Sequence, residues 1–342
     1  MAIIKKPSDH PYFPSKPKIG VLLVNLGTPD GTDYWSMRKY LKQFLMDRRV
    51  VDIFKPLWWL ILNGPILTFR PSKSGKAYEK IWDKDNYGSP LRKHTINQTK
   101  KLQELFKQDK QIIIEHAMRY GKPEIDKTLY KMKENGCTKI VLMPLYPQYA
   151  ASTSATVKDE VFKWLLEQRW QPDIRTISPW FDDSNYIKAL ANTIKDNLKN
   201  KTKPDMLLIS FHGIPKRYFM AGDPYHCHCI KTARLLKQEL KWPEDKILVT
   251  FQSRFGPEPW LQPYTDKTII DLAKNGIKNI AVVAPGFISD CLETLEELNV
   301  EAKELFIENG GQNFEYIPCL NDNKHSIKLL NQIMKTNLLG WV

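Results

Sequence analysis

Short apolar runs that alternate with amphipathic stretches constrain the fold of this chain more than any other feature. Residues 19–26 form one such run, which ends at Gly27, and comparable runs recur at 111–118, 139–145, 206–211, 246–251 and 278–284. Runs of this length are typical of strands buried on both faces of a parallel sheet. Between them, the stretches 123–136 and 264–276 carry helix start and end signals. The alternation predicts an α/β fold with helices on both faces of parallel sheets.

The same rhythm appears twice. Residues 123–145 and 263–285 each contain a proline, an amphipathic stretch, an Asn-Gly pair and an apolar run that ends in proline. We therefore predict two Rossmann-like, doubly wound parallel-sheet domains related as a pseudo-repeat, with an active-site cleft between them. Ligands of open α/β sheets bind beyond the carboxyl ends of the strands. His212 and the segments 144–149 and 285–293 follow predicted strand ends, so we expect these segments to form the site.

Composition limits the class of protein and its partners. The chain has 342 residues, 42% hydrophobic and 26% charged, which is typical of a globular protein with a sizeable core. The net charge of +13 suits an acidic lipid surface, nucleic acid or a substrate with carboxylates, although a lysine-rich surface without a specific partner explains it equally well. Basic runs with interleaved aromatic residues are absent, so we expect no nucleic-acid partner.

Cysteine spacing and hydropathy bear on location. The five cysteines, at 137, 227, 229, 291 and 319, are unevenly spaced, which favours reduced thiols in a cytosol-like compartment. Residues Met1–Pro7 lack the apolar core of a signal peptide. The apolar segment 50–67 is interrupted by charged residues and prolines, so it can lie on a membrane but cannot cross one. We expect a cytoplasmic protein that can associate with a membrane surface.

His212 is the first candidate for chemistry. It follows the apolar run 206–211 and precedes Gly213-Ile214-Pro215, a tight exit from the sheet. Imidazole titrates near neutrality, so a histidine at this edge can accept protons or bind a metal. A lone histidine at a strand end is more often a hydrogen-bonded structural residue, and this alternative stays open.

A second candidate is the acidic segment predicted to form a helix from near Ser289. Its carboxylates are Asp290, Glu293, Glu296, Glu297 and Glu301. The spacing of 293, 297 and 301 predicts a row along one helical face, although like charges at this spacing destabilise a helix. The helix N-terminus offsets part of that repulsion for the first two acids. Such a row would attract a divalent cation and still release it, whereas a solvated acidic face is the alternative.

Other patterns are weaker. The nucleotide-binding fingerprints and the Gly-x-Ser-x-Gly elbow are absent. His226-Cys227-His228-Cys229 resembles a metal cluster, but adjacent side chains rarely all point at one ion, so we favour the interpretation without a metal. Candidate walls for a flat apolar ligand are Arg119, Tyr120, Tyr146, Phe287 and Trp260, and residues that could contact carboxylates are Arg70, Tyr78 and Ser89.

Six stretches in order, from near residue 18 to about residue 335, resemble the ferrochelatase family. They are 24–29 (VNLGTP), 87–91 (YGSPL), 146–149 (YPQY), 210–215 (SFHGIP), 251–261 (FQSRFGPEPWL) and 285–298. Each stretch alone is weak, but the ordered set is specific. The resemblance implies two Rossmann-like domains, which we place at 1–169 and 170–316, and a C-terminal helix at 317–342 that returns to the first domain.

The resemblance also implies an activity, namely insertion of Fe²⁺ into protoporphyrin IX with release of two protons and no cofactor beyond the iron substrate. His212 and Glu293 match the catalytic pair, which also faces the metal, and Asp290, Glu297 and Glu301 match an acidic path for metal or protons. Positions that match porphyrin contacts are Leu26, Arg70, Tyr78, Ser89, Arg119, Tyr120, Tyr146, Trp260 and Phe287.

Three departures or additions matter. Cys291 stands where many relatives have histidine. Relatives with a [2Fe–2S] cluster carry a cysteine after the 146–149 match and three near the C-terminus, whereas Ala150-Ala151 and residues 340–342 offer none here, so we expect no such cluster. The segment at about 50–70, with Trp58-Trp59-Leu60-Ile61-Leu62, resembles an apolar lip that admits porphyrin from a membrane. Alternatives are a coproporphyrin ferrochelatase or a non-catalytic haem- or metal-binding protein.

Overall fold

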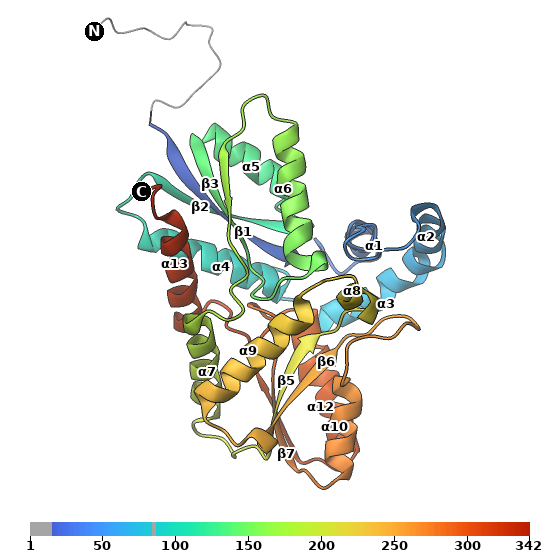
Figure 1. Ribbon diagram of the computed structural model, residues 1–342. Coiled ribbons are helices and arrows are strands. Elements are labelled where there is room, and N and C mark those ends of the chain that lie inside the picture. Colours follow the sequence, from blue (N-terminus) through green and yellow to red (C-terminus); the bar gives the residue numbers. More distant parts are fainter. Residues whose placement is uncertain (1–15, 84–86) are drawn as a thin grey trace, which may run out of the picture.

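Two parallel four-stranded sheets, each flanked by helices, make up the molecule (Figure 1). The computed structural model describes residues 16–83 and 87–342; the segment Met1–Pro7 discussed above lies outside them. The predicted α/β class is confirmed.

The first unit is built around the sheet β2-β1-β3-β4. Its strands are β1 (Lys18–Gly27), β2 (Ile112–Tyr120), β3 (Cys137–Pro144) and β4 (Asp173–Thr176). Its helices are α1 (Tyr34–Leu45), α2 (Lys55–Ile61), the π-helical turn η1 (Leu62–Ile66), α3 (Leu67–Ile81), α4 (Pro90–Leu105), α5 (Ile125–Glu134), the π-helical turn η2 (Ala151–Ala155) and α6 (Thr156–Leu166).

The second unit is built around the sheet β6-β5-β7-β8. Its strands are β5 (Met206–His212), β6 (Ile247–Gln252), β7 (Asn279–Val283) and β8 (Asn313–Ile317). Its helices are α7 (Ser184–Leu198), α8 (Lys216–Met220), α9 (Tyr225–Leu240), the 3₁₀ turn η3 (Glu244–Lys246), α10 (Thr265–Lys274), α11 (Leu292–Leu295), the π-helical segment η4 (Glu297–Ala302), α12 (Lys303–Glu308) and the last helix α13 (Lys324–Leu338).

Both sheets have the same strand order, in which the first strand of each unit pairs with the second and third and the fourth lies at an edge. All six predicted strands are present within two residues of their predicted ends. Of the four edge strands, β2 and β6 were predicted, whereas β4 and β8 were not, because their residues lack a continuous apolar run. β4 pairs with β3, so the first sheet extends past the domain boundary proposed at 169/170.

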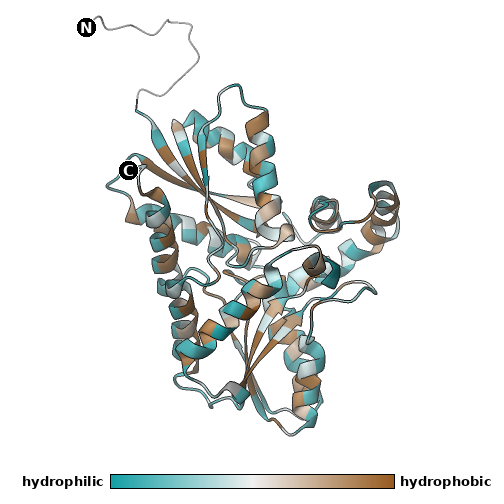
Figure 2. Cartoon of the chain, in the orientation of Figure 1, coloured by the Kyte–Doolittle hydropathy of each residue, from teal (hydrophilic) through white to brown (hydrophobic). Residues whose placement is uncertain are grey.

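Side chains of alternating residues point to opposite faces of each central strand, and both faces are covered, which explains why these strands are mostly apolar on both faces. On β1, Val21 and Leu23 enter a core that also contains Ile209 of β5, whereas Leu22 and Val24 pack in a separate core under α5 and α6. The first of these cores is continuous between the two units. Figure 2 shows the hydrophobic colour concentrated on the strands.

The last helix and the residues before it connect the two units. α13 packs against α7 of the second unit and against α4 and β3 of the first. Asp322, just before α13, is bound by His94 and Lys101 of α4 at 2.7 and 2.5 Å. The predicted lip is the hook formed by α2, η1 and the start of α3, which projects away from both sheets in Figure 1.

Candidate active site

A cavity with an empty volume of about 990 Å³ lies between the two units. Its walls come from the ends of β1, β3, β5 and β7 and from the start of the lip. The lining is mainly apolar and aromatic, with few titratable side chains, among them His212 and Glu293. An apolar cleft with a few convergent polar groups is the usual form of a small-molecule site.

His212 is the last residue of β5 and pairs with Gln252 of β6. Its Nδ1 lies 2.6 Å from the carbonyl oxygen of Gly213, which can only accept a hydrogen bond. Nδ1 therefore carries the proton in the neutral ring, and the lone pair is on Nε2. The structure thus places the imidazole at the cavity wall, 6.4 Å from the ring of Phe287 between centroids, with Nε2 as the nitrogen that can accept a proton.

The predicted helix from Ser289 is broken. α11 begins at Leu292, with Cys291 as N-cap, and lasts one turn before η4 begins. Glu293 lies on α11 and lines the main cavity, whereas Glu297 and Glu301 lie on η4 and line a neighbouring hollow of about 860 Å³. The three carboxylates are therefore divided between two adjoining spaces rather than aligned along one regular face.

The carboxylate of Glu297 is influenced by the charges of His212 and Glu293, which line the main cavity. Burial raises its pKa, the hydrogen bond from Ser253 and the charge of His212 oppose that rise, and the charge of Glu293 adds to it. The Ser253 hydroxyl donates to Glu297 Oε2 at 2.5 Å. The imidazole and the two carboxylates are thus close enough to influence one another across the wall of the cavity.

Asp290 does not join the acidic path. Its buried carboxylate accepts hydrogen bonds from Thr294 (3.0 Å), Tyr316 (2.5 Å) and Asn321 (2.6 Å), and it lines neither of the two spaces above. These donors satisfy a buried carboxylate and fix the turn before α11. The structure thus gives Asp290 a structural setting apart from Glu293, Glu297 and Glu301, and two of its donors, Tyr316 and Asn321, lie 26 and 31 residues away, beyond the reach of a local pattern.

Four of the predicted porphyrin contacts line the cavity: Leu26, Tyr146, Trp260 and Phe287. They come from both units, so the two halves close around one space. Further lining residues were not predicted, notably Val50, Gln148, Ile214 and Tyr218. Gln148 lies inside a stretch that we had matched, but Val50 and Tyr218 carry no local signal.

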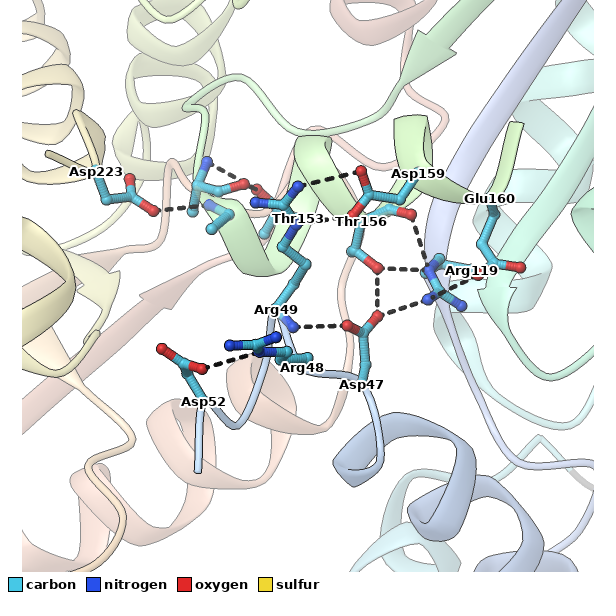
Figure 3. Close-up of polar contacts among 12 residues, drawn as sticks. Asp47, Arg48, Arg49, Asp52, Arg119, Thr153, Thr156, Asp159, Glu160 and Asp223 are labelled. Atoms are coloured by element: carbon cyan, nitrogen blue, oxygen red, sulfur yellow. Dashed lines mark hydrogen bonds and ion pairs between the residues drawn. The ribbon is translucent and has the colours of Figure 1, made fainter. Parts of the chain in front are cut away.

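Arg119 and Tyr120 are not among the residues that line the cavity. The Arg119 guanidinium and the Tyr120 hydroxyl both bind Asp47 Oδ2, at 2.5 and 2.8 Å, and Thr156 donates to the same oxygen. Figure 3 shows Arg119, Thr156 and Asp47 in this network. The structure does not bring these two predicted cavity walls to the cavity lining, because a buried carboxylate 72 and 73 residues away binds them.

The three residues predicted near carboxylates also lie outside the main cavity. Ser89 caps α4 and accepts from the amide of Arg92 at 3.2 Å. Tyr78 and Ser89 line a small pocket of about 240 Å³ on the other side of Glu293. The Arg70 guanidinium lies 4.9 Å from the centre of the Phe255 ring, and its pKa is lowered by burial and raised by the charge of Glu293. Tyr78 and Ser89 thus share a pocket with Glu293, and the charge of Glu293 acts on Arg70 and Tyr78.

Residues 226–229 form the first turn of α9, and their side chains point to different neighbours. His226 stacks on Phe251, and His228 accepts from the amide of Tyr149 at 3.2 Å. Cys229 is buried and Cys227 is exposed. No three His, Cys, Asp or Glu side chains within residues 16–83 and 87–342 are grouped to hold a metal ion.

Thiol reactivity provides a direct test of this arrangement. Burial raises the pKa of Cys137 to about 12 and that of Cys229, Cys291 and Cys319 well above the usual range, so these four thiols stay protonated and shielded. We expect iodoacetamide to modify only Cys227 in the folded protein and all five cysteines after unfolding, as counted by intact mass. Rapid native modification of Cys291 would contradict the burial of its thiol.

None of the helices in the described part of the chain combines the length and hydropathy that a bilayer span requires. The fold and the cavity define a protein of two parallel α/β units that can hold an apolar ligand in a cavity lined by an imidazole and a carboxylate.

Comparison with known proteins agrees with this class. The profile of the ferrochelatase family matches residues 18–338. A ferrochelatase of Allorhizobium ampelinum is 54% identical over 98% of both chains, and one of Brucella ovis is 49% identical over 95% of this chain and 93% of that protein. The chain belongs to the ferrochelatase family.

Solved chelatases share the fold at much lower identity. SirB from Bacillus subtilis with Fe³⁺ aligns with a TM-score of 0.55 and 14% identity, over 95% of this chain and 97% of that chain. CbiX, a terminal enzyme of sirohaem biosynthesis, aligns with a TM-score of 0.51 and 12% identity, over 93% and 98%. These likenesses concern the fold.

Proposed function

We propose that the protein inserts Fe²⁺ into protoporphyrin IX in the cavity between its two units, forming protohaem and releasing two protons. The observation that carries this proposal is the pairing of His212 and Glu293 on the wall of a mainly apolar cavity lined by Leu26, Tyr146, Trp260 and Phe287. A planar aromatic macrocycle would bury its faces against such walls, and family membership supports the reaction class.

The proposed chemistry assigns a role to each polar group. Each macrocycle loses two N–H protons as the Fe²⁺ ion enters, and His212 Nε2 is the free acceptor on the wall. We assign proton acceptance to His212 rather than tight metal binding, because a strong imidazole–iron bond would slow transfer into the ring. Glu293 faces the metal, and Glu297 and Glu301 form the hydrated side through which metal arrives or protons leave.

Substrate choice provides the test. Purified protein is mixed anaerobically with Fe²⁺, or with Zn²⁺ as a redox-inert substitute, and with either protoporphyrin or coproporphyrin, and the absorbance of the metalloporphyrin is followed. We expect turnover with protoporphyrin at the higher kcat/KM, because the exposed lip suits the less polar substrate. A higher kcat/KM with coproporphyrin would show that coproporphyrin is the substrate instead. Tight porphyrin binding without turnover would favour a haem-binding protein.

We also propose that the lip meets a membrane surface. Phe54, Leu57, Trp59, Leu60 and Phe69 are each at least half exposed, and Trp58 anchors the hook by donating to Leu45 O at 2.7 Å. Exposed apolar side chains on a short helix beside basic residues are typical of interfacial contact. The positive net charge supports an acidic lipid surface as the partner.

Vesicle sedimentation tests this contact. We expect Leu57→Glu/Leu60→Glu to weaken binding to vesicles with 30% (roughly physiological) anionic lipid by about tenfold or more, because each buried leucine contributes about 1.5–3 kcal/mol. Leu166→Glu is the matched control, since Leu166 is 84% exposed on α6, outside the lip. Equal vesicle binding by both variants would show that the lip is not the membrane contact.

A further inference from the structure

Tyr218 joins the lip of the first unit to the second unit at the rim of the cavity. It lies on α8, six residues after His212 on the same connection from β5, and its side chain lines the cavity. Its hydroxyl donates to Val50 O at 3.1 Å and accepts from the amide of Asp52 at 3.1 Å. Val50 also lines the cavity, so the contact fixes one of its walls.

The Tyr218 hydroxyl is fully used. A phenol has one donor hydrogen and accepts up to two hydrogen bonds. Besides the two lip contacts, it accepts from Arg217 Nη2 at 3.2 Å, and the Arg217 guanidinium also lies 3.7 Å from Asp52 Oδ2. The Arg217–Asp52 pair is exposed and contributes little by itself. The tyrosine is therefore the main polar contact between α8 and the lip.

The residues just before the lip, Asp47 and Arg49, are bound by the first unit. Asp47 is bound by Arg119 and Thr156, and Arg49 pairs with Asp159 at 2.7 Å. Figure 3 shows Asp47, Arg49 and Asp52 along one short connection, with Asp159 and Arg119 on its first-unit side. Residues 47–52 thus span the gap between the units, with one end tied to each.

We propose that Tyr218 is a positioning residue for porphyrin binding, which holds the Val50–Asp52 wall at a fixed distance from His212. The Tyr218 side chain lines the ligand space and binds the lip backbone, and it stands on the connection that carries the base. When the hydroxyl is removed, the freed lip groups at the exposed rim can bind water, so the fold is kept while the wall loses its tie to the second unit. This inference rests on the proposed function of the cavity.

The test compares Tyr218→Phe with Tyr34→Phe. Tyr34 donates to Leu67 O at 3.0 Å and ties the lip only to its own unit, so its loss is a matched control. Metal-free protoporphyrin is titrated by quenching of tryptophan fluorescence, and KM is measured separately for porphyrin and for Fe²⁺. We expect Tyr218→Phe to raise the porphyrin Kd and KM roughly three- to tenfold, with an unchanged KM for Fe²⁺, because the two hydrogen bonds between the hydroxyl and the lip are lost.

Hydrogen exchange supplies a readout independent of turnover. We expect faster exchange at the amide of Asp52 in Tyr218→Phe but not in Tyr34→Phe, with similar melting temperatures for all three proteins. Arg217→Met should show a smaller change of the same kind. An unchanged porphyrin Kd in Tyr218→Phe, or an equal change in Tyr34→Phe, would overturn the inference alone. Failure of the wild-type protein to bind porphyrin would overturn the proposed function and this inference together.

Discussion

Replacement of His212 by alanine is expected to lower kcat for metal insertion by roughly 10²–10⁴-fold, the usual contribution of a positioned general base. The side chain supplies the free Nε2 acceptor at the cavity wall, and its Nδ1 is already bound to Gly213 O. Porphyrin binding should change far less, because the apolar walls remain. Zinc-protoporphyrin formation in a continuous absorbance assay measures the loss.

Two further variants make the result specific. Glu293→Gln keeps the shape but removes the charge, and we expect a fall on the order of 10²-fold. His325→Ala, which removes an imidazole on α13 that pairs with Asp196, should keep wild-type turnover. Partial recovery of His212→Ala by added imidazole would support proton acceptance, whereas wild-type turnover in that variant would refute the assignment.

The second large effect concerns stability. Asp47→Ala should lower the free energy of unfolding by roughly 3–5 kcal/mol, because it leaves the buried charge of Arg119 without its main partner. The side chains of this pair are only 8% and 10% exposed, and Tyr120 and Thr156 lose the same acceptor. The urea midpoint, followed by tryptophan fluorescence, measures the change.

Asp159→Ala is the matched control, drawn beside Asp47 in Figure 3. Its partner is also an arginine, Arg49, but both side chains are nearly half exposed, so we expect a loss of about 0–1 kcal/mol. If Asp47→Ala and Asp159→Ala destabilise equally, the network around Arg119 does not stabilise the fold as described. If Arg119→Leu instead raised the KM for porphyrin strongly and left stability unchanged, Arg119 would be a porphyrin contact, as first predicted.

Much of the fold was predictable from local pattern. Residues 19–26 and 206–211 are apolar on both faces because their strands are covered on both faces, and that requirement is written into consecutive residues. β4 escaped prediction because an edge strand needs no apolar run; Asp173–Thr176 is largely polar and still completes the first sheet. Local periodicity therefore identifies central strands better than edges.

The site was predictable only in part. His212 and Glu293 were found because each lies in a matched stretch beyond a strand end, and both line the cavity. The acidic segment shows the limit: its spacing suggested one regular helix, whereas the chain forms one α-helical turn followed by a π-helical segment. That change of period sends Glu293 and Glu297 toward different spaces.

The sequence by itself determined the alternation of strands and helices, the repeated half and the position of His212 at the carboxyl edge of a sheet, because these depend on neighbouring residues. The tertiary structure decided the partners of buried polar groups. Asp290 accepts hydrogen bonds from Tyr316 and Asn321, and Arg119 donates one to Asp47. Tyr218 donates one to Val50 at the lip, 168 residues away. Each buried polar group binds whatever the folded chain brings near it, and such distant proximity leaves no local trace in the sequence.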